Sequence, residues 1–311
     1  MNTGFLNYIQ NFVERIGIPL EAKIEIMKAE KKIISNESIA KIFSRYKIDF
    51  MNNNISLNET LIQIGSFSKE LEIPEYTLHF IFLINCTDIL LSNYEGKQLD
   101  KQIFWDSMED FHYKLMECHE VMGVWGTFVA EWFTGFLNMK RFALGRFQYD
   151  EISYEGDTYK KNGIVLNKGD KVYEFHIPSS GKAFDKSARI ASYRKAYEFF
   201  GINKKGGILN LVCYSWLLYK ELENILPGNS NILDFMHDFD IVLSMDKENF
   251  DDSWRIFGKY YKMPLEQLPT DTSLRKAIVG HLASGEKMGV GFGIILFDGN
   301  KIINNYRDCS Q

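Results

Sequence analysis

Three cations stand at the start of a predicted helix. In the segment 173–201, YEFHIPSSGKAFDKSARIASYRKAYEFFG, a strand-like stretch is followed by a loop of small residues and then by a helical pattern. The cations near its start are Lys182, Lys186 and Arg189. Cations at a helix N-terminus are unfavourable by roughly 0.3–1 kcal/mol each, because the helix dipole is positive there. We therefore expect an anion site at this loop; the alternative is that the cations are only solvated, with Asp185 as N-cap.

Two other patterns suggest a ligand role but fail on geometry or context. His237 lies beside Asp238 and Asp240 in a stretch that alternates like a strand. On a strand the histidine faces one side and both aspartates the other, so the three cannot share one ion. The stretch GVGFG at 289–293 leads into an apolar strand, whereas a dinucleotide-binding loop leads into a helix. We expect its glycines to mark a bulge or a close approach at the sheet, and we predict no metal site.

The composition is that of a folded protein without the charge of a nucleic-acid binder. The chain has 311 residues, of which 45% are hydrophobic and 25% charged, and its formal net charge is -5. Nucleic-acid-binding domains usually carry a basic stripe instead. The apolar run at 78–91 is shorter than a bilayer span and contains Asp88, so we expect a buried helix there. No partner among nucleic acids or membranes is predicted, and the oligomeric state is left open.

The cysteines and the N-terminus indicate the compartment. The four cysteines are scattered along the chain and form no CxxC pair: Cys86, Cys118, Cys213 and Cys309. This usage fits a reducing compartment, and Cys213, inside an apolar run, is expected to be an inert core thiol. The first residues, MNTGFLNYIQNFVER, lack the pattern of a secretory signal. We predict a cytoplasmic location.

The elements that carry these residues divide into two regions with different periods. In residues 1–140 apolar residues recur at three and four positions, which predicts an all-helical N-terminal domain of six or seven helices. Helix starts are expected at Ser56 or Asn58, at Pro74 and at Asp100. In residues 141–311 the pattern changes to alternation with turn signals, which predicts a domain that begins with an antiparallel meander.

The second region mixes helices and strands. The loop at 178–183 is expected to join a strand at 171–178 to a helix at 185–200, followed by an apolar strand at 207–216 and a helix at 217–226. Further strands are predicted at 231–243, 253–261 and 289–297, with a helix from about Thr272. The fold class is therefore α+β or α/β, with a mixed, partly antiparallel sheet after the helical domain.

The loop and three longer blocks resemble a known family. The loop PSSGKA looks like the acyl-CoA diphosphate loop of GNAT-type N-acyltransferases, whose pattern is Arg or Gln, two residues, Gly, one residue, then Gly or Ala. Gly181 and Ala183 match it, and Pro178 stands where Arg or Gln is usual. The blocks FHIPSSGKAF, VCYSWLLYKELENILPGNSNILDF and LPTDTSLRKAIVGHLASGEKMGVGFG look like the C-terminal domain of bacterial GNAT-like acyltransferase-domain proteins. Members of that family also carry a helical N-terminal acyltransferase domain.

The resemblance implies a binding mode for the ligand. On the GNAT template the strands at 171–178 and 207–216 are the fourth and fifth, which splay apart and admit the pantetheine arm of acyl-CoA. Backbone groups near Ile177 would face the pantetheine. The backbone N–H groups implied for the diphosphate belong to the loop residues Ser179, Ser180, Gly181, Lys182 and Ala183. Lys182, Lys186 and Arg189 would add charge-assisted contacts to phosphate oxygens. The alternative for Gly181 is a strand-to-helix turn that needs a small residue.

The same resemblance suggests an acid and a base. Acyl transfer to an amine needs a base for the amine proton and an acid for the departing thiolate. In GNAT enzymes the acid is often a tyrosine on the helix after the fifth strand, which here implies Tyr219, or Tyr214 at the strand's end. Glu174 and His176 share one face of the fourth strand, and either can serve as base directly or through water. The alternatives are a packing role for Tyr214 and a hydrogen-bonded, half-buried His176.

Three functions remain open at this level. The first is an acyltransferase that uses acetyl-CoA or another acyl-CoA and no metal, with an unidentified, small-molecule or amine acceptor and with the helical domain shaping the acceptor site. The second is a non-catalytic GNAT-like module that binds CoA, another phosphorylated ligand or a protein partner. Pro178 in place of Arg or Gln keeps the second function open. The third is a purely structural interaction protein, which is favoured if the cation-rich helix start lies away from any cleft.

Overall fold

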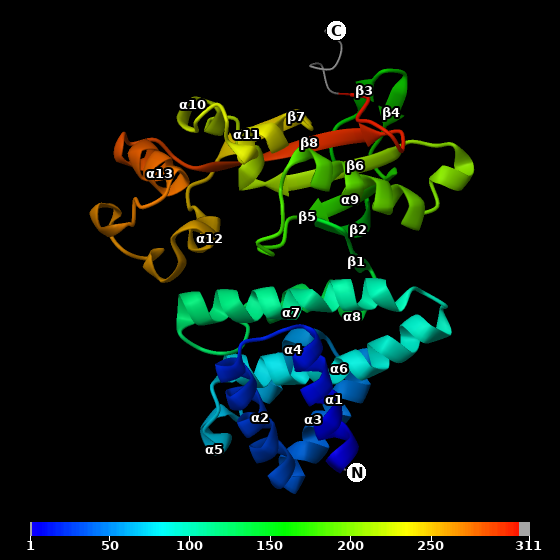
Figure 1. Cartoon of the computed structure of the whole chain (residues 1–311), viewed down its shortest axis with the longest axis vertical. Coiled ribbons are helices and arrows are strands. Elements are labelled where there is room, and N and C mark those ends of the chain that lie inside the picture. Colours follow the sequence, from blue (N-terminus) through cyan, green and yellow to red (C-terminus); the bar gives the residue numbers. More distant parts are fainter. Residues whose placement is uncertain (1, 305–311) are drawn as a thin grey trace. The chain divides into compact units, whose positions relative to one another are not determined.

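The structure is a computed structural model that describes the backbone of residues 2–304 and the side chains from Tyr8 onward, Lys205 excepted. Cys309 lies outside the described residues. The chain divides into two compact units, Met1–Phe142 and Ala143–Gln311 (Figure 1). The first is helical up to Leu137 and the second contains a mixed sheet, which confirms the predicted fold class.

The first unit consists of eight α-helices and one 3₁₀ helix within the described residues. They are α1 (Asn2–Arg15), α2 (Leu20–Ser35), α3 (Glu37–Met51), α4 (Leu57–Gly65), α5 (Ser68–Leu71), α6 (Glu75–Gly96), α7 (Lys101–Met122), η1 (Ala130–Phe133) and α8 (Thr134–Leu137). Within residues 2–304 every helix is too short or too polar to cross a lipid bilayer.

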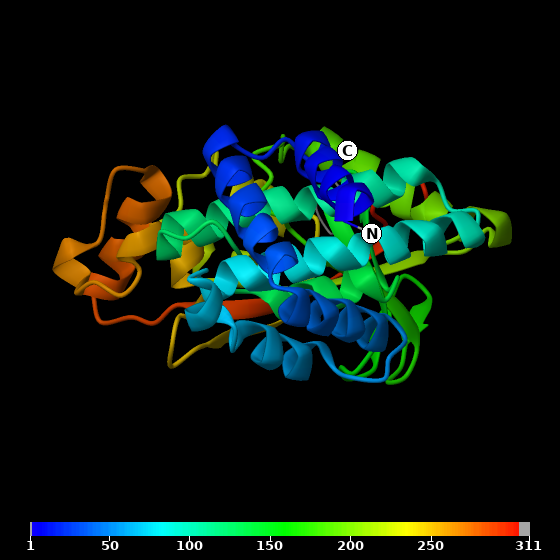
Figure 2. The same cartoon turned by 90° about the horizontal axis from the view of Figure 1, so that it is seen from below.

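Helix α6 is the centre of this unit. It packs against α1, α2, α3, α4 and α7, and Figures 1 and 2 show it in cyan among the blue N-terminal helices. Its residues from Thr77 to Thr87 are buried without interruption. A helix that is apolar all round belongs in a core. The prediction of a buried helix at 78–91 is confirmed.

Local capping signals place several helix starts. Ser56 caps α4 in a capping box with Glu59, and Asp100 caps α7 by accepting a hydrogen bond from the Gln102 N–H. Pro74 precedes α6. The Ser56 and Asp100 side chains each satisfy a backbone donor that the first helical turn leaves unpaired, whereas Pro74 has no side-chain donor or acceptor to offer. The three predicted starts are therefore confirmed, with Ser56 the cap of the Ser56 or Asn58 alternative.

The second unit is organised by a six-stranded sheet of order β1-β2-β5-β6-β8-β7. Its strands are β1 (Arg141–Leu144), β2 (Phe147–Ser153), β5 (Lys171–His176), β6 (Leu209–Ser215), β7 (Asp240–Asp246) and β8 (Gly289–Phe297). The small hairpin of β3 (Tyr159–Lys161) and β4 (Ile164–Leu166) stands apart from this sheet. Strands β5 and β6 are parallel, and the pairs β2–β5, β6–β8 and β7–β8 are antiparallel.

Helix α9 (Lys186–Phe199) packs on one face of this sheet through aromatic side chains (Figure 1). Tyr193 of α9 is fully buried, and its ring lies 5.6 Å from that of Phe147 and 5.7 Å from that of Phe175, centroid to centroid. Large aromatic side chains bury the most apolar area per residue, so this cluster is a main source of the unit's stability. It fixes α9 against β2 and β5.

Three predicted elements need correction. The expected strand at 231–243 is instead the helix α11 (Asn231–Met236) followed by β7, because Ser230 caps a helix there by accepting from the Ile232 N–H. The expected strand at 253–261 is a run of short helical turns: η4 (Asp251–Ser253), α12 (Trp254–Phe257) and η5 (Gly258–Tyr260). The helix predicted at 217–226 is reduced to η3 (Trp216–Leu218) and α10 (Leu222–Ile225). The predicted helix near Thr272 is present as α13 (Ser273–Ala283).

Candidate functional site

Strands β5 and β6 pair over two residues and then separate. The ladder joins Tyr173 to Leu211 and Glu174 to Val212. Beyond it, Phe175 and His176 remain paired with β2, whereas Cys213–Ser215 remain paired with β8. Because the two strands are parallel, the sheet opens at their common carboxyl ends, the edge where ligands bind in open α/β sheets. The predicted splay of these strands is confirmed.

The loop between β5 and α9 lies at this opening. Ser179, Lys182 and Ala183 are exposed, whereas Ile177 and Ser180 are half-buried. Gly181 has a φ of +64°, and a Cβ built there would meet open space. A glycine is therefore favoured by the backbone conformation and not by crowding. The loop leaves a strand and enters a helix of 14 residues, which is the setting of many phosphate sites.

The entry into α9 is capped as predicted. Asp185 accepts a hydrogen bond from the Ala188 N–H at 2.9 Å. The Lys182 N–H donates to the Ser180 hydroxyl oxygen at 3.3 Å. Both Lys182 and Lys186 are exposed. Two of the three cations that drew attention to this helix therefore remain accessible to a ligand.

Arg189 is in a different position from the one predicted. Its side chain is fully buried, and its guanidinium donates to the Asp238 carboxylate through Nε at 2.6 Å and Nη2 at 3.1 Å. A further ion pair joins it to Asp234 at 2.9 Å. One turn into α9, position 189 faces the interior, on the side of Tyr193. The predicted phosphate contact of Arg189 is therefore wrong, because the guanidinium is enclosed and paired.

Arg146 brings a cation to the loop that the sequence reasoning missed. It lies between β1 and β2, and its Nη1 donates to the Pro178 carbonyl oxygen at 3.0 Å. Its guanidinium also lies 5.0 Å from the centre of the Phe184 ring. Pro178 is the position where the GNAT loop pattern has Arg or Gln. A guanidinium thus reaches this position from 32 residues away, which no local pattern indicates.

Three polar side chains meet on one face of β2 and β5. Asp150 lies directly opposite Glu174 in the ladder, and His176 is two residues beyond Glu174, so all three point to the same face. His176 Nε2 lies 3.0 Å from Asp150 Oδ2 and 3.9 Å from Glu174 Oε2. The carboxylate of Asp150 can thus orient the imidazole. The sequence reasoning predicted Glu174 and His176 but not Asp150, because strand register cannot be read from β2 alone.

The two candidate tyrosines differ sharply. Tyr214 is 47% exposed and, with Val212, lies on the sheet face of Glu174. Tyr219 is 4% exposed and follows η3 instead of lying on a helix. Its hydroxyl is 2.6 Å from Asp246 Oδ1. Burial, with the Asp246 carboxylate as a further cause, raises the pKa of Tyr219 well above its usual range.

The strand behind Tyr219 explains the glycines of GVGFG. A Cβ at Gly289 would lie 2.4 Å from the Tyr219 ring, and one at Gly291 would lie 2.0 Å from the Leu218 carbonyl oxygen. At Gly293 it would lie 2.6 Å from Phe239. The alternate glycines of β8 thus admit other segments on one face. The predicted close approach is confirmed, and no loop for a nucleotide is formed.

The other residues considered from the sequence have structural partners. Asp240 accepts from Lys161 at 2.9 Å and from the Tyr159 hydroxyl at 3.0 Å, and Asp238 is the partner of Arg189. His237 follows the last residue of α11 and is not in a strand, so the predicted strand geometry cannot be the reason why it shares no ion with the aspartates. The reason is that both aspartates are bound to other side chains. Cys213 is buried, and burial raises the pKa of its thiol, which confirms an inert core thiol.

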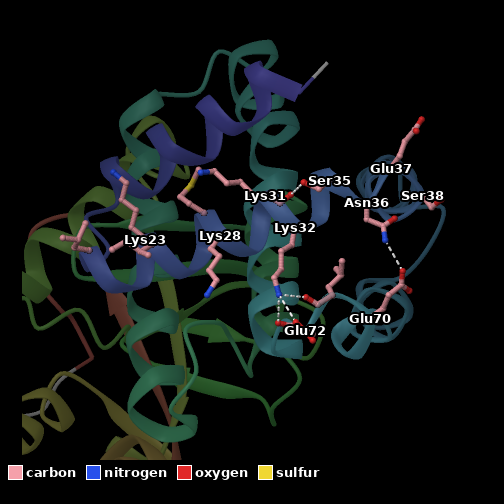
Figure 3. A pocket seen from close by; sticks show the side chains of 14 residues that line it. Lys23, Lys28, Lys31, Lys32, Ser35, Asn36, Glu37, Ser38, Glu70 and Glu72 are labelled. Carbon is pink, nitrogen blue, oxygen red and sulfur yellow. Dashed lines mark hydrogen bonds and ion pairs between the residues drawn. The ribbon is translucent and has the colours of Figure 1, made fainter.

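The helical unit contains a separate concave surface. A groove of about 1140 Å³ runs along α2 and reaches α5 (Figure 3). Its lining mixes lysines with glutamates, and Lys32 already donates to the Leu71 carbonyl oxygen at 2.9 Å and pairs with Glu72 (Figure 3). None of the predicted site residues lines this groove. The polar groups with acid–base chemistry lie in the sheet unit instead.

Known protein families match both regions of the chain. A family model described as an N-acyltransferase N-terminal domain matches residues 7–139, and one described as a GNAT-like C-terminal domain matches residues 142–295. No curated protein matches the chain.

Solved structures share the fold at low sequence identity. An acyltransferase mutant in complex with octanoyl-CoA is 17% identical, with a TM-score of 0.72 over 94% of this chain and 87% of that one. An acyltransferase in complex with decanoyl-CoA and teicoplanin is 17% identical, with a TM-score of 0.73 over 92% and 87%. An acyltransferase in complex with decanoyl-CoA is 20% identical, with a TM-score of 0.71 over 91% and 86%. At these identities the likeness establishes the fold across both units.

Proposed function

Because this chain belongs to the family that joins an N-acyltransferase N-terminal domain to a GNAT-like C-terminal domain, we propose that it is an acyl-CoA-dependent acyltransferase with an amine acceptor. The observation that carries the proposal is the two-residue ladder between β5 and β6. It leaves the sheet open beside a glycine loop and a helix N-terminus. An acyl-CoA has the shape and charge for this place, with an extended pantetheine arm and an anionic diphosphate.

The diphosphate would lie against the loop at 179–183. The backbone N–H groups there, together with the N-terminus of α9, offer donors to phosphate oxygens. Lys182 and Lys186 are exposed and add positive charge. Arg146, held by the Pro178 carbonyl, supplies the guanidinium that the loop itself lacks. The proline at position 178, where the GNAT pattern has Arg or Gln, is therefore compatible with diphosphate binding.

The pantetheine would enter between β5 and β6. Past Glu174 and Val212, the strand groups of β5 and β6 no longer bond to each other. The backbone near Ile177 can therefore pair with the amides of the pantetheine, as an added strand pairs with a sheet edge. The thioester then arrives near the face that carries Glu174, His176 and Tyr214.

The chemistry follows from these side chains. The amine nitrogen of the acceptor attacks the thioester carbonyl, and His176, oriented by Asp150, takes the proton that the amine loses. The tetrahedral intermediate collapses by breaking the carbon–sulfur bond, and the departing thiolate takes a proton from Tyr214. The products are an amide and CoA, and no redox partner is needed. Glu174 lies 3.9 Å from His176 and can accept the amine proton through water as the second candidate base.

The similar structures suggest which acyl groups this chain can accept. They hold octanoyl-CoA and decanoyl-CoA, so we extend acyl donors of that length, beside acetyl-CoA, to this chain. One similar structure also holds teicoplanin, which supports room for a large ligand beside the acyl-CoA in this fold. The acceptor of this chain is left at the level of an amine. A cytoplasmic location stays a prediction, supported by three free, buried thiols in the described part of the chain.

The test is calorimetric titration of the full chain with acetyl-CoA, octanoyl-CoA and decanoyl-CoA, beside a loop variant. Gly181→Val forces a β-branched residue into a left-handed conformation and should abolish binding. Gly163→Val is the matched control, because Gly163 has a φ of +78°, is equally open, and lies in the β3–β4 turn. Binding by the wild type and the control but not by the loop variant supports the proposal. Equal binding by all three proteins contradicts the assigned loop.

Transfer is measured separately from binding. Release of the free thiol from the best-binding acyl-CoA, in the presence of a panel of amines, reports turnover. Saturable thiol release with formation of an amide supports the acyltransferase. Binding that the loop variant loses, without transfer to any amine in the panel, would favour the non-catalytic CoA-binding module instead.

A further inference from the structure

Asp150 and Glu174 place two carboxylates directly opposite each other on one sheet face. Their side chains are 13% and 26% exposed, so solvent only partly screens the repulsion. Like charges at facing positions of an antiparallel pair are destabilising. Such an arrangement is stabilised when a cation shares the site. The donors that surround such a cation decide which kind of cation it can be.

The third donor is an imidazole nitrogen. His176 Nε2 lies 3.0 Å from Asp150 Oδ2 and 3.9 Å from Glu174 Oε2, and the three ligand atoms all lie within 4.8 Å of one another. Zinc binds nitrogen and carboxylate oxygen at about 2.0–2.2 Å, which sets tetrahedral ligand atoms roughly 3.4 Å apart. The two measured separations bracket this value. Small side-chain rotations would complete the geometry without moving the backbone.

We propose that Asp150, Glu174 and His176 form a three-ligand site for a divalent transition-metal ion, with Zn²⁺ as the representative ion. One imidazole and two carboxylates suit zinc and its neighbours, whereas magnesium prefers oxygen ligands alone. The two carboxylate charges balance the charge of the ion. All three residues lie on paired strands, which hold a ligand set more firmly than loops do. The partial exposure of each leaves a path for the ion and an open coordination position.

The site has a consequence that rests on the proposed function. Without metal, the Nε2–H of His176 faces Asp150, and Nδ1 is the nitrogen that accepts the amine proton. A metal bound at Nε2 shifts the ring proton to Nδ1, and it also occupies the oxygen of Glu174, so both candidate bases are lost. The metal-bound protein therefore cannot take that proton, and zinc inhibits acyl transfer. The metal-free protein is the active form. Metal binding itself does not depend on this consequence, since it requires only the three side chains.

The experiment measures zinc binding to the full chain, freed of metal, by competition with a chromophoric chelator. One equivalent of Zn²⁺ is expected to bind, without competition from Mg²⁺. His176→Gln, Asp150→Asn and Glu174→Gln should each weaken binding by at least about tenfold, the loss that removal of even an outer-shell partner can cause. His281→Ala is the matched control: His281 lies in the same unit and bonds to the Lys287 carbonyl oxygen, away from the cluster. It should bind as the wild type does.

A second measurement reports the ligands directly. Co²⁺ in place of zinc should give the visible absorption of a four- or five-coordinate site in the wild type and in the control, but not in His176→Gln. Absence of binding, or binding that survives all three ligand substitutions, would overturn the metal site.

Titration of the metal-free protein with decanoyl-CoA separates the two proposals. Zinc binding without acyl-CoA binding leaves the metal site standing and removes the proposed function. The reverse result does the opposite. If both ligands bind, unchanged thiol release with zinc at saturation would overturn the inhibition.

Discussion

The Arg189 guanidinium forms a two-pronged ion pair with the Asp238 carboxylate inside the sheet unit, through Nε at 2.6 Å and Nη2 at 3.1 Å. The Tyr193 hydroxyl donates to the same carboxylate at 3.1 Å. The pair joins the start of α9 to the residues after α11. The helix whose N-terminus faces the proposed phosphate site is therefore anchored by a buried charge, and not only by its aromatic face.

Removal of one partner of this pair should be strongly destabilising. Arg189→Met leaves the Asp238 carboxylate buried without its cation, and we expect a loss of about 3–5 kcal/mol in the free energy of unfolding. Lys186→Met, on the exposed side of the same helix, should change it by less than about 0.5 kcal/mol. Urea denaturation of both variants measures the difference. A loss at position 189 no larger than that at position 186 would show that the pair does not hold α9.

Glu30 in α2 should make stability depend on pH. Its side chain is fully buried, and among residues 2–304 neither carboxylate oxygen has a hydrogen-bond partner of good geometry. Burial raises the pKa of Glu30 from 4.5 to about 8. The folded state thus binds this proton more tightly than the unfolded state. The stability gained from the proton is complete below about pH 4.5 and is lost as the pH rises towards 8.

The matching variant is Glu30→Gln, which cannot ionise. Between pH 5 and pH 8 the wild type should lose on the order of 3–5 kcal/mol through this group, and the variant should not. Glu25→Gln, on the exposed side of α2, should follow the wild type. Thermal or urea denaturation across this pH range gives the three curves. Parallel curves for wild type and Glu30→Gln would mean that Glu30 is not protonated in the folded protein.

The two tyrosines near the opening should separate chemistry from stability. Tyr214→Phe removes the exposed hydroxyl on the face of Glu174, and we expect kcat to fall by about 100-fold or more, as for loss of a general acid. Affinity for acyl-CoA should not change. Tyr219→Phe removes a hydroxyl already bound to Asp246, so it should lower stability by about 1 kcal/mol and leave kcat unchanged. The opposite ranking of kcat would return the acid role to Tyr219.

Two glycine replacements in the sheet unit should change its stability in opposite directions. Gly291→Ala places a Cβ 2.0 Å from the Leu218 carbonyl oxygen and must displace the segment after β6, so it should lower the melting temperature markedly. Gly280→Ala, in the middle of α13 with open space around it, should raise stability by about 1 kcal/mol. Differential scanning calorimetry compares the two. A harmless Gly291→Ala would show that the close approach at β8 does not constrain the fold.

Local signals in the sequence were enough to predict the strand, loop and helix from 171 to 200. Alternation marked β5, Asp185 marked the start of α9, and Gly181 marked a turn, although the structure shows that this turn requires positive φ and not a small side chain. The short β5–β6 ladder was expected from family resemblance and not from the residues. The sequence of β5 alone does not predict where its pairing with β6 ends.

Long-range pairings account for what the sequence did not predict. Asp150 becomes part of the cluster only through the register of β2 with β5. The buried partner of Arg189 is Asp238, which lies 49 residues later along the chain, so no local pattern indicates the burial of Arg189. The apolar residues of the stretch at 231–243 fit both a strand period and a helix period, and the strand prediction followed only the first. Leu233 and Phe235 alternate as in a strand, whereas Phe235 and Phe239 are four apart as in a helix. The cap at Ser230 decided between them.

The most direct test of the account is an experimental structure of the full chain with decanoyl-CoA or CoA bound. The account predicts the pantetheine between β5 and β6 beyond Glu174 and Val212, with the diphosphate against the 179–183 amides and the thioester sulfur near Tyr214. A CoA bound elsewhere on the chain, with β5 and β6 closed or filled by side chains, would contradict it.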